Sequence, residues 1–168
     1  MADDQFRIKT ITILEKYEAD IEPFRGREEE FFRLHEPFER KVAEGNVGLK
    51  EGKNAIWTLV CGGTATAYNN ANARIGVGDS NAAEADTQTG LQGANTAFRA
   101  MDTGYPTFGT NEQAVFAATF GMAEANFAWE EWTIDNGATA NKNLNRKVQA
   151  LGTKLNTETW RLTCTLSL

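Results

Sequence analysis

The sequence contains few of the residues from which metal sites and nucleophilic sites are built. Its 168 residues include one histidine, His35, and two cysteines, Cys61 and Cys164, which lie far apart and form no CxxC pair. The chain therefore has too few histidine and cysteine residues to build a metal site from them. Neither serine, Ser80 nor Ser167, lies in a GxSxG motif. We expect no metal, no cofactor, and two reduced, buried thiols.

Positive charge is also scarce. The chain has 17 Lys and Arg against 23 Asp and Glu, giving a net charge of −6. Modules that bind nucleic acid carry a basic patch, and anionic membranes attract basic segments, so we expect neither partner. The longest apolar stretch, residues 114–123, is well short of the about 20 residues that a membrane-spanning helix needs. The acidic start lacks an apolar segment, which favours a protein made in the cytosol and not exported.

The composition is that of a globular protein. Hydrophobic residues make up 41% of the chain and aromatic residues 10%, which excludes a largely disordered chain. The length is sufficient for one domain with its own core. We predict that residues 46–168 form this domain. Residues 1–45 are expected to supply an N-terminal strand followed by a charged, Phe-rich arm.

The C-terminal segment has the clearest strand pattern. Trp160, Leu162, Cys164, Leu166 and Leu168 alternate with polar residues, which predicts a strand with one buried face. Further strands are predicted at 6–14, 73–78, 96–102, 113–120, 127–134 and 144–151. In the first of these, the parity of the apolar positions changes near Thr10, so we expect a bulge or the strand's end there.

One helix is predicted, at residues 54–61, with Asn54 as its N-cap and Gly62 and Gly63 at its end. Residues 81–97 are small and polar and predict a long ordered loop. Short strands, Gly- and Asn-rich turns and no alternation of strands with helices predict a mainly β fold. The fold class is an antiparallel β-sandwich or jelly-roll-like domain with one short helix and an N-terminal arm.

Two groups of residues are candidates for a binding or catalytic site. The segment Gly76-Val77-Gly78-Asp79-Ser80-Asn81 is similar to the start of a dinucleotide-binding loop, but Asn81 replaces the third glycine and no helix pattern follows. We interpret it as a tight turn in which glycine supplies an unusual backbone conformation.

The second group consists of carboxylates around Trp129 and Trp132, namely Glu124, Glu130, Glu131 and Asp135. A glycosidase needs two converging carboxylates, whereas Glu130 and Glu131 should point to opposite faces of a strand. The two tryptophans suit a sugar platform, a core or a subunit interface. We predict no catalytic residues and retain Trp129 and Trp132 as interface candidates.

Four of the ten phenylalanines are concentrated in a charged segment. Phe24, Phe31, Phe32 and Phe38 lie within fifteen residues, and prolines at 23 and 37 exclude one long helix. Two interpretations stay open. The segment is a short helix or strand that packs on its own domain, or an arm that buries these four interface candidates on a neighbouring subunit.

Several motifs resemble those of small structural proteins of tailed bacteriophages. The motifs are Gly52-Lys53-Asn54-Ala55-Ile56-Trp57, Ile75-Gly76-Val77-Gly78-Asp79-Ser80, Thr87-Gln88-Thr89-Gly90-Leu91-Gln92-Gly93 and Ala125-Asn126-Phe127-Ala128-Trp129-Glu130-Glu131-Trp132. The resemblance covers roughly residues 46–168 and carries over no catalytic residue. It implies a virion protein assembled in the host cytoplasm.

This resemblance implies a capsid decoration, or cement, protein. Such a protein binds the outer surface of the assembled head, contacts the major capsid protein and stabilises the shell by mass action. The resemblance also implies a homotrimer. The alternatives are a tail- or fibre-associated adaptor and a carbohydrate-binding module that uses Trp129 and Trp132.

Overall fold

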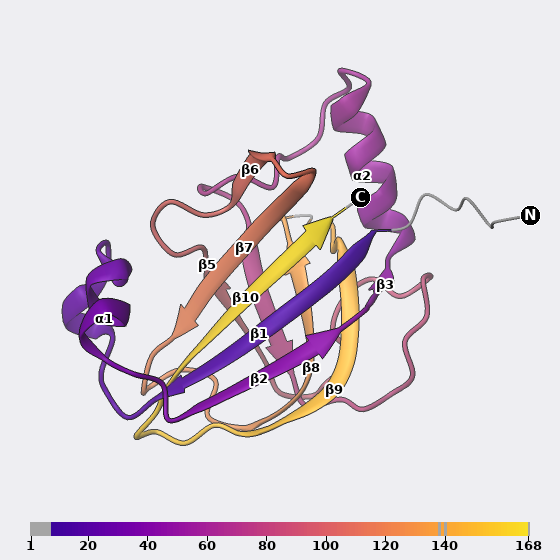
Figure 1. Ribbon diagram of the computed structural model, residues 1–168. Coiled ribbons are helices and arrows are strands. Elements are labelled where there is room, and N and C mark those ends of the chain that lie inside the picture. The colour runs from indigo at the N-terminus through magenta and orange to yellow at the C-terminus, as the bar shows by residue number, and fades with distance from the viewer. Residues whose placement is uncertain (1–7, 138, 140, 168) are drawn as a thin grey trace, which may run out of the picture.

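Two five-stranded antiparallel sheets face each other in the computed structural model, which describes residues 8–137, 139 and 141–167 (Figure 1). Sheet A has the strand order β2-β1-β10-β7-β6, and sheet B the order β3-β9-β8-β4-β5. The strands are β1 (Lys9–Tyr17), β2 (Glu39–Glu44), β3 (Val47–Gly48), β4 (Arg74–Gly78), β5 (Thr96–Ala100), β6 (Thr107–Thr110), β7 (Gln113–Phe120), β8 (Ala128–Asp135), β9 (Asn145–Thr153) and β10 (Thr159–Ser167). The predicted mainly β sandwich is confirmed.

The core lies between the sheets and is rich in tryptophan. Trp129 and Trp132 from sheet B and Trp160 from sheet A are at most 1% exposed. The Trp129 ring packs edge-to-face on the Trp160 ring, with centroids 4.8 Å apart. The Trp132 indole Nε1 donates to Thr12 Oγ1 at 3.2 Å, so this hydrogen bond joins the two sheets. A buried indole needs such a partner, because an unpaired N–H is costly away from water.

Strand β1 differs from its prediction. It runs without a register shift from Lys9 to Tyr17 and pairs with both β2 and β10, so it is an internal strand of sheet A. No bulge or end occurs at Thr10, because Thr10, Thr12 and Leu14 are the buried residues of a single face. The division at residue 45 therefore does not separate an arm from the sandwich. Phe6, which the prediction included, lies outside the described residues.

The remaining strand predictions are confirmed to within a few residues. In β10 the inward face contains Trp160, Leu162, Cys164 and Leu166, all buried, as the period-two pattern indicates. Leu168 lies outside the described residues. The pattern did not indicate β2, β3 or β6, because these strands are short or highly charged.

The described residues form two α-helices instead of the one predicted, together with a 3-10 helix. They are η1 (Glu22–Phe24), α1 (Glu28–Leu34) and α2 (Lys50–Val60). Helix α2 starts four residues before the predicted N-cap Asn54. Its first turn lies so close to the segment before β9 that a Cβ atom on Gly52 would collide with the backbone of Asn143 and Leu144. This contact explains the glycine at position 52.

The C-terminus of α2 is as predicted. The Gly62 N–H donates to the Leu59 carbonyl at 3.2 Å, and the Gly63 N–H donates to the Thr58 carbonyl at 2.7 Å. Gly62 has a φ of +77°, a conformation that glycine adopts without strain. This is the Schellman arrangement that commonly ends a helix. Within the part of the chain that the structure describes, no helix is long and apolar enough to span a membrane.

Glycines 76 and 78 provide space, which corrects the predicted tight turn. Both lie within β4, and neither has a positive φ. A Cβ atom on Gly78 would lie 2.5 Å from Glu131 Oε1, and one on Gly93 would lie 3.1 Å from the same oxygen. Gly78 and Gly93 therefore leave room for the Glu131 carboxylate between β4 and the loop that follows it.

That carboxylate is part of a fully buried ion pair. Arg146 Nε donates to Glu131 Oε2 at 2.6 Å, and both side chains are 0% exposed. The backbone N–H groups of Gln92 and Gly93 donate to Glu131 Oε1 at 2.9 and 2.7 Å. Arg146 Nη1 donates to the Ala82 carbonyl at 2.9 Å. The pair thus fixes both ends of the predicted long loop onto sheet B.

We predict that Arg146→Met destabilises the fold by about 3–5 kcal/mol, because it leaves the Glu131 charge buried without its partner. The measurement is equilibrium denaturation in urea. Arg27→Met, which removes an exposed ion pair with Glu30, is the matched control and should cost no more than about 1 kcal/mol. Similar losses in the two variants would contradict the role of the buried pair.

Candidate interaction surfaces

The Phe-rich segment packs on its own chain. Phe31 is 0% exposed and lies in a small cluster with Tyr17 and Ile21, separate from the main core. Its ring centroid is 5.2 Å from that of Tyr17 and 5.6 Å from that of Phe24. In Figure 1 helix α1 lies at one end of the sandwich, near the end of β1. Of the two open interpretations, the structure shows packing on the same domain.

Charged residues attach this cluster to sheet A. The Arg161 guanidinium lies 4.0 Å from the centroid of the Phe32 ring and 3.3 Å from the Asp102 carboxylate. Burial raises the pKa of Asp102, while a hydrogen bond from Thr119 and the charge of Arg161 oppose that rise. Glu28 accepts a hydrogen bond from the Thr103 N–H at 3.2 Å. The segment is therefore bound to the sandwich by several polar contacts.

The other aromatic candidates divide into buried and exposed residues. Phe24 and Phe32 are half-buried, and only Phe38, at 49% exposure, presents much of its ring to the surface. Trp129 and Trp132 are fully buried. Both tryptophans lie in the core although they are three residues apart in β8, and the β8–β9 pairing shifts register between Trp129 and Glu131. Neither ring is accessible to stack on a sugar or to anchor a partner in this monomer.

Three strongly exposed apolar side chains lie at the end of β1 opposite to helix α1. Trp57 and Val60 of α2 are 60% and 68% exposed, and Phe108 of β6 is 73% exposed. Figure 1 shows α2 projecting beyond the sandwich, with β6 at the same end. Helix α2 buries only Gly52 and Ala55, so its last two turns gain little from packing within this chain.

The chain segments at this end carry no charged side chain, apart from Glu112 at the tip of the β6–β7 hairpin beside them. Residues 54–73 contain no Asp, Glu, Lys or Arg, and residues 103–111 contain none either. In a chain that is 24% charged, twenty residues would ordinarily include about five charges. We call the surface formed by α2 from Ile56 onward, the segment to residue 73 and β6 the uncharged end. The sequence analysis missed it, although the long uncharged run was visible there.

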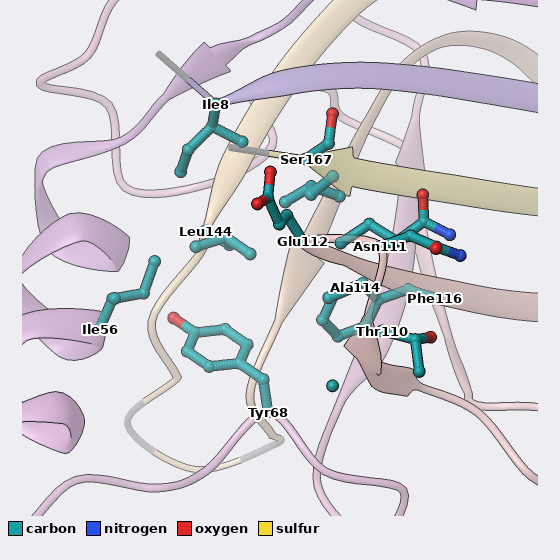
Figure 2. Close-up of a pocket in the computed structure, with 13 residues that line it drawn as sticks. Ile8, Ile56, Tyr68, Thr110, Asn111, Glu112, Ala114, Phe116, Leu144 and Ser167 are labelled. Atoms are coloured by element: carbon teal, nitrogen blue, oxygen red, sulfur yellow. The ribbon is translucent and has the colours of Figure 1, made fainter. Parts of the chain in front are cut away.

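An apolar pocket of about 690 Å³ opens within the uncharged end. Figure 2 shows Ile56 and Tyr68 on one side of it and Thr110, Asn111 and Glu112 on the other. Its apolar lining is completed by Ile8, Phe116, Leu144 and Leu166. The pocket therefore separates α2 from the β6–β7 hairpin, and its strand residues come from β6, β7 and β10 of sheet A.

The hairpin beside the pocket has a strained tip. Asn111 and Glu112 have φ values of +54° and +53°, between the paired residues Thr110 and Gln113. Positive φ at both central positions defines a type I′ turn, which favours Asn followed by Gly. A glutamate in the second position costs roughly 1–2 kcal/mol relative to an unstrained conformation. Strained residues of this kind concentrate at functional sites, which is consistent with a role in recognition.

The thiols differ in environment. Both cysteines are free, but only Cys164 is buried, so the prediction of two buried thiols is wrong for Cys61. Burial raises the pKa of the Cys164 thiol to about 12. Cys61 is the C-cap of α2 and is exposed because the helix end projects from the sandwich. Among the described residues no group of three His, Cys, Asp or Glu side chains is placed to hold a metal ion.

Comparison with known proteins adds no relative. No protein-family model, no curated protein and no solved structure matches the chain.

We predict that Phe31→Ala destabilises the protein by about 3 kcal/mol or more, because it empties the centre of the small aromatic cluster. Phe38→Ala is the control, and it should change the free energy of unfolding by no more than about 0.5 kcal/mol, since the ring is half exposed. Urea denaturation measures both. Equal effects would show that the cluster does not form in the isolated chain.

Proposed function

We propose that the protein is a virion structural protein that decorates a bacteriophage capsid, and that the uncharged end binds the major capsid protein. The observation that carries the proposal is the projecting, apolar end of α2, where Trp57 is 60% exposed within an uncharged surface. Tryptophan is enriched among the residues that dominate binding energy, and the centres of protein interfaces are depleted of charge. The motif resemblance to phage structural proteins supports the choice of partner.

The mechanism is the burial of apolar surface on an assembled shell. The pocket and the α2 end lie side by side, so one contact fills the pocket and covers Trp57 and Val60 at once. Binding to the assembled shell but not to separated capsid subunits shifts the equilibrium toward the shell. The acidic remainder of the chain, with its net charge of −6, stays in solvent, where it favours solubility.

The direct test is copy number in purified phage particles that encode the chain, measured by quantitative mass spectrometry. A number comparable to that of the major capsid protein supports decoration of the shell. A small fraction of that number would contradict decoration and favour the tail-adaptor alternative. Complete absence from particles would overturn a structural role in the virion.

A variant connects this measurement to the uncharged end. We predict that Trp57→Lys weakens binding to particles that lack the protein by at least about 10-fold, because it places a charge in an apolar contact. Leu34→Lys is the matched control, since Leu34 is 61% exposed on α1 at the other end of the sandwich. Undiminished binding by Trp57→Lys would exclude the uncharged end as the docking surface.

A further inference from the structure

One carboxylate lies at the mouth of the apolar pocket. Of the described residues that line the pocket, Glu112 alone carries a charge, and the rest of the lining is apolar or uncharged. Glu112 is exposed, and in Figure 2 its side chain points from the hairpin tip toward Ile8. The carboxylate therefore lies where solvent meets the apolar cavity.

The charge of Glu112 is not balanced within the part of the chain that the structure describes. No Lys or Arg of residues 8–137, 139 and 141–167 lies within ion-pair distance of its carboxylate. The buried carboxylates of Glu131 and Asp135, in contrast, each bind an arginine. An apolar cavity with one unbalanced negative charge at its mouth is complementary to an occupant that is apolar and carries a positive charge at one end.

The backbone at this position favours glycine over glutamate. Glu112 has a φ of +53° at the second central position of the type I′ turn, where glycine is the usual residue. Glycine would adopt this conformation without strain, so the backbone gives no reason for a glutamate. Strained residues concentrate at functional sites, and we interpret the Glu112 side chain as the functional part of this turn.

We propose that the pocket takes a bulky apolar side chain of the capsid protein that is carried next to a lysine or arginine, and that this basic residue pairs with Glu112. The source of the segment rests on the proposed function, whereas its chemistry rests on the pocket. A cavity of about 690 Å³ is within the range of pockets that enclose ligands. Lysine and arginine place apolar stems along apolar surface while the charged head reaches a carboxylate.

The wall opposite the hairpin suits an apolar anchor. The Tyr68 hydroxyl donates a hydrogen bond to the Lys142 carbonyl at 3.0 Å, so this polar group already has a partner. An occupant therefore meets the Tyr68 ring together with the Ile56 side chain on this side. The inner part of the pocket needs no polar group from the occupant, and the one charge that needs a partner lies at the mouth.

The test measures which charge the pocket prefers, with three probes of similar shape. Phenylbutylamine, phenylbutanol and phenylbutyric acid share an apolar body and are cationic, neutral and anionic at neutral pH. Titration of the isotope-labelled chain, followed by the NMR signals of residues 108–114 and of Tyr68, gives the three affinities. We expect a Kd of about 1–10 mM for the amine, given its size. The amine should bind about 3- to 10-fold more tightly than the acid, with the alcohol between them.

Two substitutions at position 112 test whether the carboxylate causes this preference. Glu112→Gln should remove the difference between amine and acid and leave the affinity for the alcohol unchanged. Glu112→Gly should do the same, and it should resist urea at least as well as the unaltered chain, because glycine relieves the strain. Glu18→Gln removes an exposed carboxylate beyond the far end of β1 and is the matched control, which should keep the preference.

Three results of the titration would overturn the proposal. They are no binding of the amine, equal affinities for amine and acid in the unaltered chain, and a preference for the amine that survives Glu112→Gln.

Phage particles that lack the protein separate this proposal from the proposed function. Glu112→Lys should weaken binding to them about 10-fold, because lysine at this position repels the basic residue of the segment. If Trp57→Lys weakens binding and Glu112→Lys does not, docking on the capsid stands and the basic segment is wrong. If no form of the chain binds particles although the probes show the charge preference, the proposed function fails and the capsid protein is not the source of the segment.

Discussion

The buried ion pair between Glu131 and Arg146 holds the loop of residues 79–95 against sheet B. Residues 79–95 form no helix or strand, yet they lie against sheet B because these two side chains accept from and donate to the loop backbone at both of its ends. An unpaired charge in such a place is strongly unfavourable, so each contact is required by the others. The glycines at 78 and 93 follow from this requirement, since a larger residue would occupy the space of the carboxylate.

Charged side chains are distributed unevenly over the molecule. Several charged side chains are drawn into the structure, among them Asp135, which binds Arg74 through two hydrogen bonds, and Asp102, which faces Arg161. Residues 54–73 of the uncharged end contain no charged side chain, and Trp57 and Val60 are exposed there.

The sequence predicts β10 most clearly, because its apolar residues recur at every second position and are buried. It misplaces β1 because threonines fill two of the inward positions, so that isoleucine, normally the mark of the buried face, lies outside at 11 and 13. It does not reveal that Trp129 and Trp132 share the core, because residues three apart in a regular strand point to opposite faces. The role of Gly78 in β4 depends on Glu131, a side chain more than fifty residues away.

Hydrogen exchange of the free chain tests most directly whether the buried pair orders the loop. The amides of Gln92 and Gly93 donate to Glu131 and should exchange as slowly as those of β8, although they belong to no strand. The amides of residues 64–66, in the exposed segment after α2, should exchange rapidly. Rapid exchange at Gln92 and Gly93, equal to that of residues 64–66, would contradict the account.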